Sequence, residues 1–178
     1  MADSETPSGG ETPGGATPGG NSMGETAESD GPRPDARVLI NTHYIKDLSF
    51  ENPNAPAIFT KREGHDIKVS IDVRAANLQQ RLYEVTLAIK ATASIEEQTA
   101  FIIELDFAGL VSVGELVPES DIESLLSVEV PRYLFPFARN VVADVSRDGG
   151  YPPLLINPVD FNALRAQQQA ADQQAATA

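Results

Sequence analysis

The sequence predicts an α+β protein, in which four β-strands precede a group of helices. Between residues 38 and 108, four segments alternate apolar and polar residues at every second position, which is typical of strands with one buried face. Beyond residue 120, apolar residues recur at helical spacing instead. The short connection Ser94–Gln98 favours an antiparallel hairpin. We therefore expect a four-stranded antiparallel sheet that C-terminal helices cover on one face only.

The four expected strands are Val38–Phe50, Asp66–Arg74, Tyr83–Ala91 and Phe101–Ala108. In the first strand, strict alternation places Asp47 and Glu51 on one face. His43 and Ile45 fall on that same face, whereas Tyr44 falls on the opposite one. Each strand has one apolar face and one wetter, mostly acidic face, so one side of the sheet should be open to solvent.

The helical region should begin near Ser120, which has the spacing of a capping box with Glu123. Within this region, the helix around Leu134–Val145 carries an apolar stripe that is too wide for one sheet to cover. The uncovered face needs a partner, and an identical subunit is the commonest one.

Prolines and glycines should set the limits of the main helix. Pro131 and Pro136 should break or kink the helical run, because proline lacks the backbone N–H that a helix interior needs. We therefore expect the better-formed helix at Phe135–Arg147, and we expect Gly149 and Gly150 to end it.

The connection after these glycines, Tyr151–Pro158, is apolar and rich in proline, and its first part should be extended. Asn157 should cap a last helix, with Pro158 at its first position and its end near Gln169. The connection either packs on the core or forms the wall of a groove for an extended apolar peptide. The side chains expected to line such a groove are Phe50, Phe59, Tyr151, Leu154 and Leu155.

Composition divides the 178 residues into one domain and two tails. Residues 1–35 contain no Val, Ile, Leu, Phe, Tyr or Trp, so we expect a disordered, acidic Gly/Pro/Thr-rich tail with a net charge of −6. Residues 36–165 should form the single folded domain, and 166–178 an Ala/Gln-rich C-terminal tail.

Composition and motifs also exclude several classes of function. Residues 36–164 hold 18 acids against 11 bases, which argues against a nucleic-acid partner. The chain has no cysteine, and its two histidines, His43 and His65, lack the spacing of a metal site. No phosphate-binding or nucleophile motif is present. We expect a non-enzyme without cofactor or metal. The absence of a secretory signal and of a membrane span predicts a soluble cytoplasmic protein.

The wetter face of the sheet is a second candidate site. Asp47 and Glu51 share one face of the first strand, and Ile102 and Glu104 share one face of the fourth. These residues are either an ordinary solvated face or a mixed apolar and acidic patch that binds a partner.

Four segments of the chain resemble the SecB family of bacterial protein-export chaperones. The matching segments are YIKDLSFENPNAP at 44–56, TAFIIE at 99–104, LFPFAR at 134–139 and PPLLINPVDFNAL at 152–164. The resemblance covers about residues 36–165 in the order of the family. The long acidic N-terminal tail departs from the family pattern, and the resemblance implies nothing about its role.

This resemblance implies a homotetramer, built as a dimer of dimers with helices between outward-facing sheets. It implies ATP-independent binding of unfolded preproteins along apolar grooves, and their delivery to the SecA translocation ATPase. The positions that match the SecA-contacting set of the family are Asp47, Glu51, Ile102 and Glu104. The SecA tail that docks there in this family is basic and carries its own zinc. A different class of function would be an oligomer that binds a small lipid-like ligand in the same groove.

Overall fold

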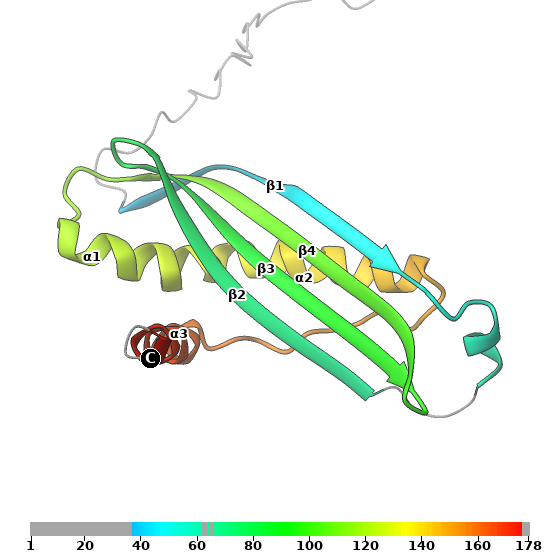
Figure 1. Cartoon of the computed structure of the whole chain (residues 1–178). Coiled ribbons are helices and arrows are strands. Elements are labelled where there is room, and N and C mark those ends of the chain that lie inside the picture. Colours follow the sequence, from blue (N-terminus) through cyan, green and yellow to red (C-terminus); the bar gives the residue numbers. More distant parts are fainter. Residues whose placement is uncertain (1–36, 62–63, 65, 176–178) are drawn as a thin grey trace, which may run out of the picture. The chain divides into compact units, whose positions relative to one another are not determined.

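The computed structural model describes residues 37–61, 64 and 66–175. The predictions for residues 1–35 and for His65 lie outside these residues. The described chain forms one sheet and a set of helices (Figure 1). No helix among the described residues reaches both the length and the apolar character that crossing a membrane demands.

The sheet contains four antiparallel strands in the order β1-β4-β3-β2. The strands are β1 (Val38–Glu51), β2 (Asp66–Gln79), β3 (Leu82–Ile95) and β4 (Gln98–Val113). The predicted number of strands and their antiparallel pairing are confirmed, although each strand extends further than the alternation indicated. Because β1 inserts beside β4, the first and last strands of the sequence are neighbours, and β1 and β2 form the two edges.

Two irregularities in the register of β1 make the prediction of strict alternation wrong in the middle of that strand. They lie between Ile40 and Thr42 and between Ile45 and Asp47. His43 therefore turns to the face that the helices cover, where its ring stacks on Phe137 with centroids 4.4 Å apart. A β-bulge inserts an extra residue and so exchanges the two faces until a second bulge restores them.

The same exchange brings Tyr44 and Lys46 to the opposite face of the sheet, which we call the outer face. Both side chains donate hydrogen bonds at 2.5 Å to the carboxylate of Glu84. The bond to Glu84 raises the pKa of the Tyr44 hydroxyl, and the bond from Lys46 lowers the pKa of the Glu84 carboxyl.

Helix formation continues without a break from α1 (Glu119–Ser124) through one π-helical turn, η2 (Leu125–Glu129), into α2 (Val130–Asp148). The prediction that Pro131 or Pro136 breaks the helical run, so that the better-formed helix starts only at Phe135, is wrong, because α2 starts at Val130 and includes both prolines. Pro131 is the second residue of α2, just after η2, whose wider i→i−5 bonding gives the proline ring room and needs no N–H from it. Pro136 costs one hydrogen bond, which the burial of the surrounding apolar face offsets.

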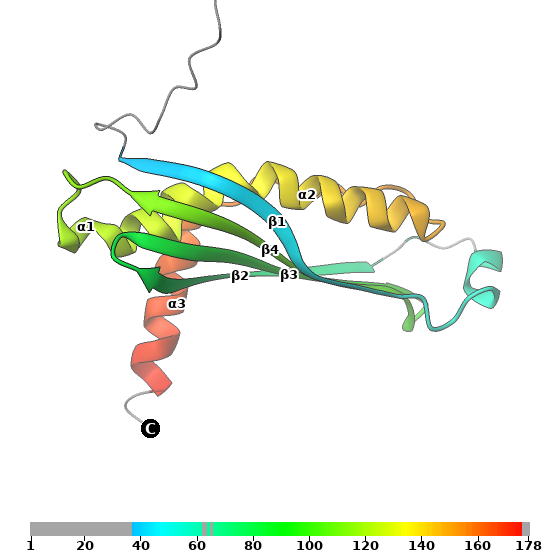
Figure 2. The ribbon, with the colours of Figure 1, turned by 90° about the horizontal axis from the view of Figure 1, so that it is seen from above.

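Helix α2 packs along one face of the sheet (Figure 2). Val130, Leu134, Ala138 and Val142, four residues apart, are fully buried against it. Gly109 of β4 permits this close approach, since a Cβ there would lie 2.9 Å from Leu134 Cδ2. The helix ends at Gly149 and Gly150 as predicted, and Gly150 has a φ of +91°.

Two further expectations about helix ends are wrong. No side chain caps α1, because its first residue is Glu119 and Ser120 already lies inside the helix. Helix α3 (Phe161–Ala175) begins later than expected and runs past Gln169. Asp160 caps it in place of Asn157. The Asp160 carboxylate accepts the backbone N–H groups of Asn162 and Ala163, at 2.9 and 3.2 Å.

Candidate protein-binding surfaces

The β1–β4 register brings together the four residues predicted at the wet face of the sheet. Glu51 of β1 lies opposite Ile102 of β4. Further along the same two strands, Ser49 lies opposite Glu104, and Asp47 lies opposite Asp106. Paired residues of antiparallel strands project to the same face. We call Asp47, Glu51, Ile102 and Glu104 the acidic patch. Asp47 and Glu104 also border one shallow hollow of about 330 Å³ on the outer face.

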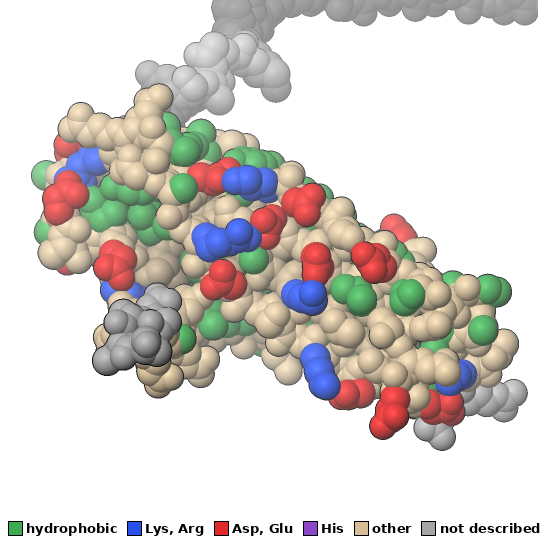
Figure 3. All heavy atoms as spheres, viewed as in Figure 1, with side chains coloured by type: hydrophobic (Ala, Val, Ile, Leu, Met, Phe, Trp, Pro, Cys, Tyr) green, Lys and Arg blue, Asp and Glu red, His purple; other side chains and the backbone are tan. Residues whose placement is uncertain are grey.

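Several bases share the outer face with these acids (Figure 3). The ammonium of Lys90 donates to Glu104 at 2.5 Å, and the guanidinium of Arg74 donates to Asp106 at 2.7 Å. The pKa of Lys90 is raised, chiefly because Glu104 accepts this hydrogen bond. Among the described residues, Asp47 and Glu51 form no ion pair. Exposed ion pairs of this kind contribute little to stability.

An apolar groove runs between β2 and the segment 151–160. Two adjoining hollows, of about 440 and 260 Å³, share Ile67, Leu154 and Leu155 as lining residues. Ile67 is 42% exposed and Leu155 is 69% exposed. The other apolar residues that line these hollows are Val69, Ile71, Phe101, Tyr151, Pro152, Pro153, Ile156, Val159 and Leu164. A surface of this kind can hold apolar side chains of an extended chain.

An aromatic cluster borders one end of the groove. The Tyr151 ring lies 4.8 Å from that of Phe101 and 5.2 Å from that of Phe59, between centroids. The Phe50 ring stacks with that of Phe101, with centroids 6.1 Å apart. The Tyr151 hydroxyl lies within hydrogen-bonding distance of the Asn52 side chain and of a main-chain carbonyl in β4, and burial raises its pKa. Three of the five predicted groove residues therefore lie in one cluster.

Burial separates the predicted groove residues into two kinds. Tyr151 and Leu154 are 6% and 9% exposed, so they belong to the floor and take part in core packing. Phe59 and Leu155 are 48% and 69% exposed and present apolar surface to solvent. Phe50 lies between these extremes, half-buried over Gly149. The segment 151–158 therefore packs on the core through Tyr151 and Leu154, and it lines the apolar groove through the exposed Leu155.

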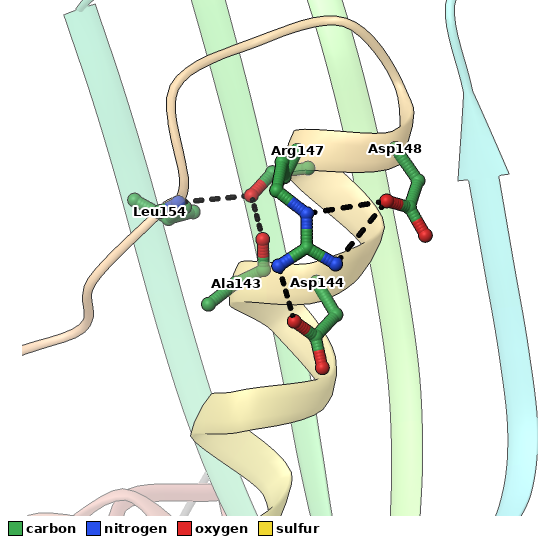
Figure 4. Close-up of polar contacts among 6 residues, drawn as sticks. Ala143, Asp144, Arg147, Asp148 and Leu154 are labelled. Atoms are coloured by element: carbon green, nitrogen blue, oxygen red, sulfur yellow. Dashed lines mark hydrogen bonds and ion pairs between the residues drawn. The ribbon is translucent and has the colours of Figure 1, made fainter.

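Ser146 anchors the groove wall to α2, and sequence reasoning missed it. Its Oγ accepts the N–H of Leu154 at 2.8 Å and donates to the carbonyl of Ala143 at 3.0 Å (Figure 4). Beside this anchor, Arg147 bonds Asp144 and Asp148 on the exposed side of the helix. Ser146 is fully buried and continues the series of buried α2 residues that are four positions apart, after Val142. A polar residue at such a position needs a hydrogen-bond partner, and this was the signal in the sequence that could have identified it.

One face of α2, with the adjacent part of β1, has no covering element among the described residues. Tyr133 and Phe137 of α2 are 60% and 47% exposed, and Ile45 of β1 is 47% exposed. Val38 and Ile40 line a further hollow with Tyr133. Phe137 belongs to the wide apolar stripe noted in the sequence, and exposed apolar patches can mark interaction sites.

An acidic patch, an open apolar groove and an uncovered apolar helix face together define a protein-binding α+β domain. Comparison with known proteins places it among chaperones. The profile of the family described as "SecB: Preprotein translocase subunit SecB" matches residues 32–172. The chain belongs to the SecB family of protein-export chaperones, as the four sequence segments predicted.

Two relatives illustrate this membership. The chain is 47% identical over 156 residues to "Protein-export protein SecB" of Parvibaculum lavamentivorans, covering 86% of this chain and 91% of the relative. It is 46% identical over 143 residues to the protein of the same name from Rhodospirillum rubrum, covering 79% and 88%. Among solved structures, the Mycobacterium tuberculosis Rv1957 SecB-like chaperone, in complex with a ChAD peptide from the Rv1956 HigA1 antitoxin, has a similar fold. Its TM-score is 0.59 at 15% identity, over 69% of this chain and 91% of that one.

Proposed function

We propose that this protein is an ATP-independent chaperone of the cytoplasm. It binds unfolded preproteins in the apolar groove, keeps them competent for translocation and delivers them to the SecA ATPase. The observation that carries the proposal is the open groove beside Leu155, which leaves large apolar side chains exposed. Family membership supports the same conclusion.

Client binding and release follow from weak, repeated contacts. Each apolar side chain of a client that enters the groove contributes at most about 1.5–3 kcal/mol, before the cost of ordering the chain. Several grooves on one oligomer act together through their effective concentration. A client that folds buries its apolar segments and can no longer bind, so release needs no nucleotide. Slow-folding clients stay exposed for longer and are therefore retained.

The proposed assembly is a homotetramer, a dimer of dimers in which the outer faces point away from the centre. The exposed side chains of Tyr133 and Phe137 support it, because apolar groups are costly to leave in water. Native mass measurements should give about four times the 19.0 kDa of the chain. A monomer at micromolar concentration would contradict the assembly. Addition of a denatured protein should shift the tetramer to a discrete complex, whereas a shift only with lipid would favour a small-ligand binder.

Delivery to SecA uses the acidic patch in this proposal. Its carboxylates would complement a basic, partly apolar segment of the partner, and Ile102 would supply the apolar contact. The zinc that such a segment carries belongs to the partner. The groove and the patch lie on different parts of the sheet, so client and motor can bind at the same time.

The domain limits are part of the same proposal, with 36–165 as the chaperone domain. Removal of residues 1–35 should leave the thermal midpoint within a few degrees and client capture unchanged, because the segment has no large apolar side chain to pack. Solubility should fall slightly, since six net negative charges are lost. A larger fall of the midpoint in a thermal melt would show that the segment packs on the domain.

A further inference from the structure

Lys90 of β3 faces the acidic patch from the neighbouring strand. It lies directly opposite Glu104 in the β3–β4 register, and its Nζ is 2.5 Å from Glu104 Oε1. The side chains of the two residues are 57% and 52% exposed, so water surrounds the pair. Glu51 also favours the charged form of Lys90, which raises the pKa of that ammonium further.

The remaining bases of this part of the outer face are engaged elsewhere. Lys46 bonds Glu84, and Arg74 bonds Asp106. Among the residues that the structure describes, the ion pair between Lys90 and Glu104 is thus the only one that includes a residue of the acidic patch. In the free protein, Glu104 is already occupied, whereas Asp47 and Glu51 are open to a partner.

We propose that Lys90 sets the charge selectivity of the acidic patch by competing with the partner for Glu104. A partner with one basic side chain gains little at Glu104, because it only exchanges one exposed ion pair for another. A partner with several closely spaced basic side chains can bind Asp47 and Glu51 first and then displace the Lys90 ammonium. The long, flexible lysine stem lets that ammonium move into solvent without disturbing the strand.

The patch therefore selects segments with clustered positive charge over proteins with scattered lysines. This inference rests on the proposed role of the patch as a docking surface. It assigns to Lys90 a role distinct from docking, since the lysine opposes binding by any cation and opposes weakly charged partners most.

Calorimetry with a hexalysine peptide at low ionic strength tests the inference on the full-length protein. Lys90→Gln should tighten binding by about two- to fivefold, the range expected for one exposed ion pair. Glu104→Gln should weaken binding, and Lys90→Gln should have little further effect in the Glu104→Gln background. Lys68→Gln is the matched control, because Lys68 is an exposed base on the outer face of β2. It removes the same charge two strands away from β4 and should have a smaller effect.

Several results would overturn the inference: weaker binding by Lys90→Gln, an effect equal to that of Lys68→Gln, or an undiminished gain in the Glu104→Gln background. The absence of saturable binding to the parent protein would also overturn it. Parallel titrations with SecA separate this result from the docking proposal. Loss of SecA binding in a patch variant, without coupling between Lys90 and Glu104, rejects the inference alone. Coupling with hexalysine, without any effect of the patch on SecA, rejects the docking proposal alone.

Discussion

Replacing Leu155 by Asp should abolish most capture of an unfolded client while the domain stays folded. Leu155 is 69% exposed and borders both hollows of the groove, so its loss removes client contact without opening a cavity in the core. A carboxylate there must also lose water when an apolar segment binds. We expect at least a tenfold loss of affinity for a denatured protein, about 1.5–3 kcal/mol, measured by calorimetry or fluorescence.

Leu116→Asp is the matched control for this variant. Leu116 is 80% exposed and lies on the connection between β4 and α1, outside the lining of the groove. Equal losses in the two variants would show that clients bind to exposed apolar residues in general and not to the groove. Leu154→Ala cannot decide the question, because Leu154 is buried and its truncation should cost about 2–3 kcal/mol of stability.

Replacing Asp47 and Glu104 together by Ala should abolish most SecA binding at moderate ionic strength. Each exposed carboxylate contributes only modestly to affinity, so the acids must act jointly, and removing two from one hollow should cost at least about tenfold. Salt screens exposed charges, and the affinity of the parent protein should therefore fall as salt is added. Calorimetry at two salt concentrations measures both effects.

The control for the double variant is Glu115→Ala with Glu119→Ala. Both side chains are exposed beside Arg81 and line no part of the hollow at Asp47 and Glu104, so the control removes the same total charge from outside the patch. It should keep most of the affinity for SecA. An unchanged affinity after loss of Asp47 and Glu104, or a parent affinity that does not respond to salt, would place the docking surface elsewhere.

The alternation in the sequence was sufficient to predict the strands but not their faces throughout. A period of two identifies a half-buried strand from local chemistry alone. The two bulges of β1 depend on pairing with β4, and they moved Tyr44 and His43 to faces opposite to those expected. Asp47 and Glu51 lie on the same face as predicted, because both follow the second bulge, after which the original alternation is restored.

Helix limits were harder to predict, for a similar reason. Local rules gave Pro136 as a break, yet burial of the face that holds Leu134 and Ala138 outweighs one lost hydrogen bond.

Non-local packing also explains the parts of the groove that were missed. The sequence indicated the wall at Leu155, but the opposite wall at Ile67 and the anchor at Ser146 follow only from the tertiary arrangement. The acidic patch likewise required the neighbouring positions of β1 and β4, which periodicity does not determine.

Refolding kinetics of a slow-folding secretory precursor, measured without any nucleotide, provide the decisive test of ATP-independent client binding in the groove. The precursor is diluted from denaturant into buffer alone, into the parent protein and into the Leu155→Asp variant. The parent protein should slow or arrest refolding at stoichiometric amounts, and the variant should lose most of this effect. An unchanged refolding rate with the parent protein, or an arrest that requires ATP, would contradict the proposed function.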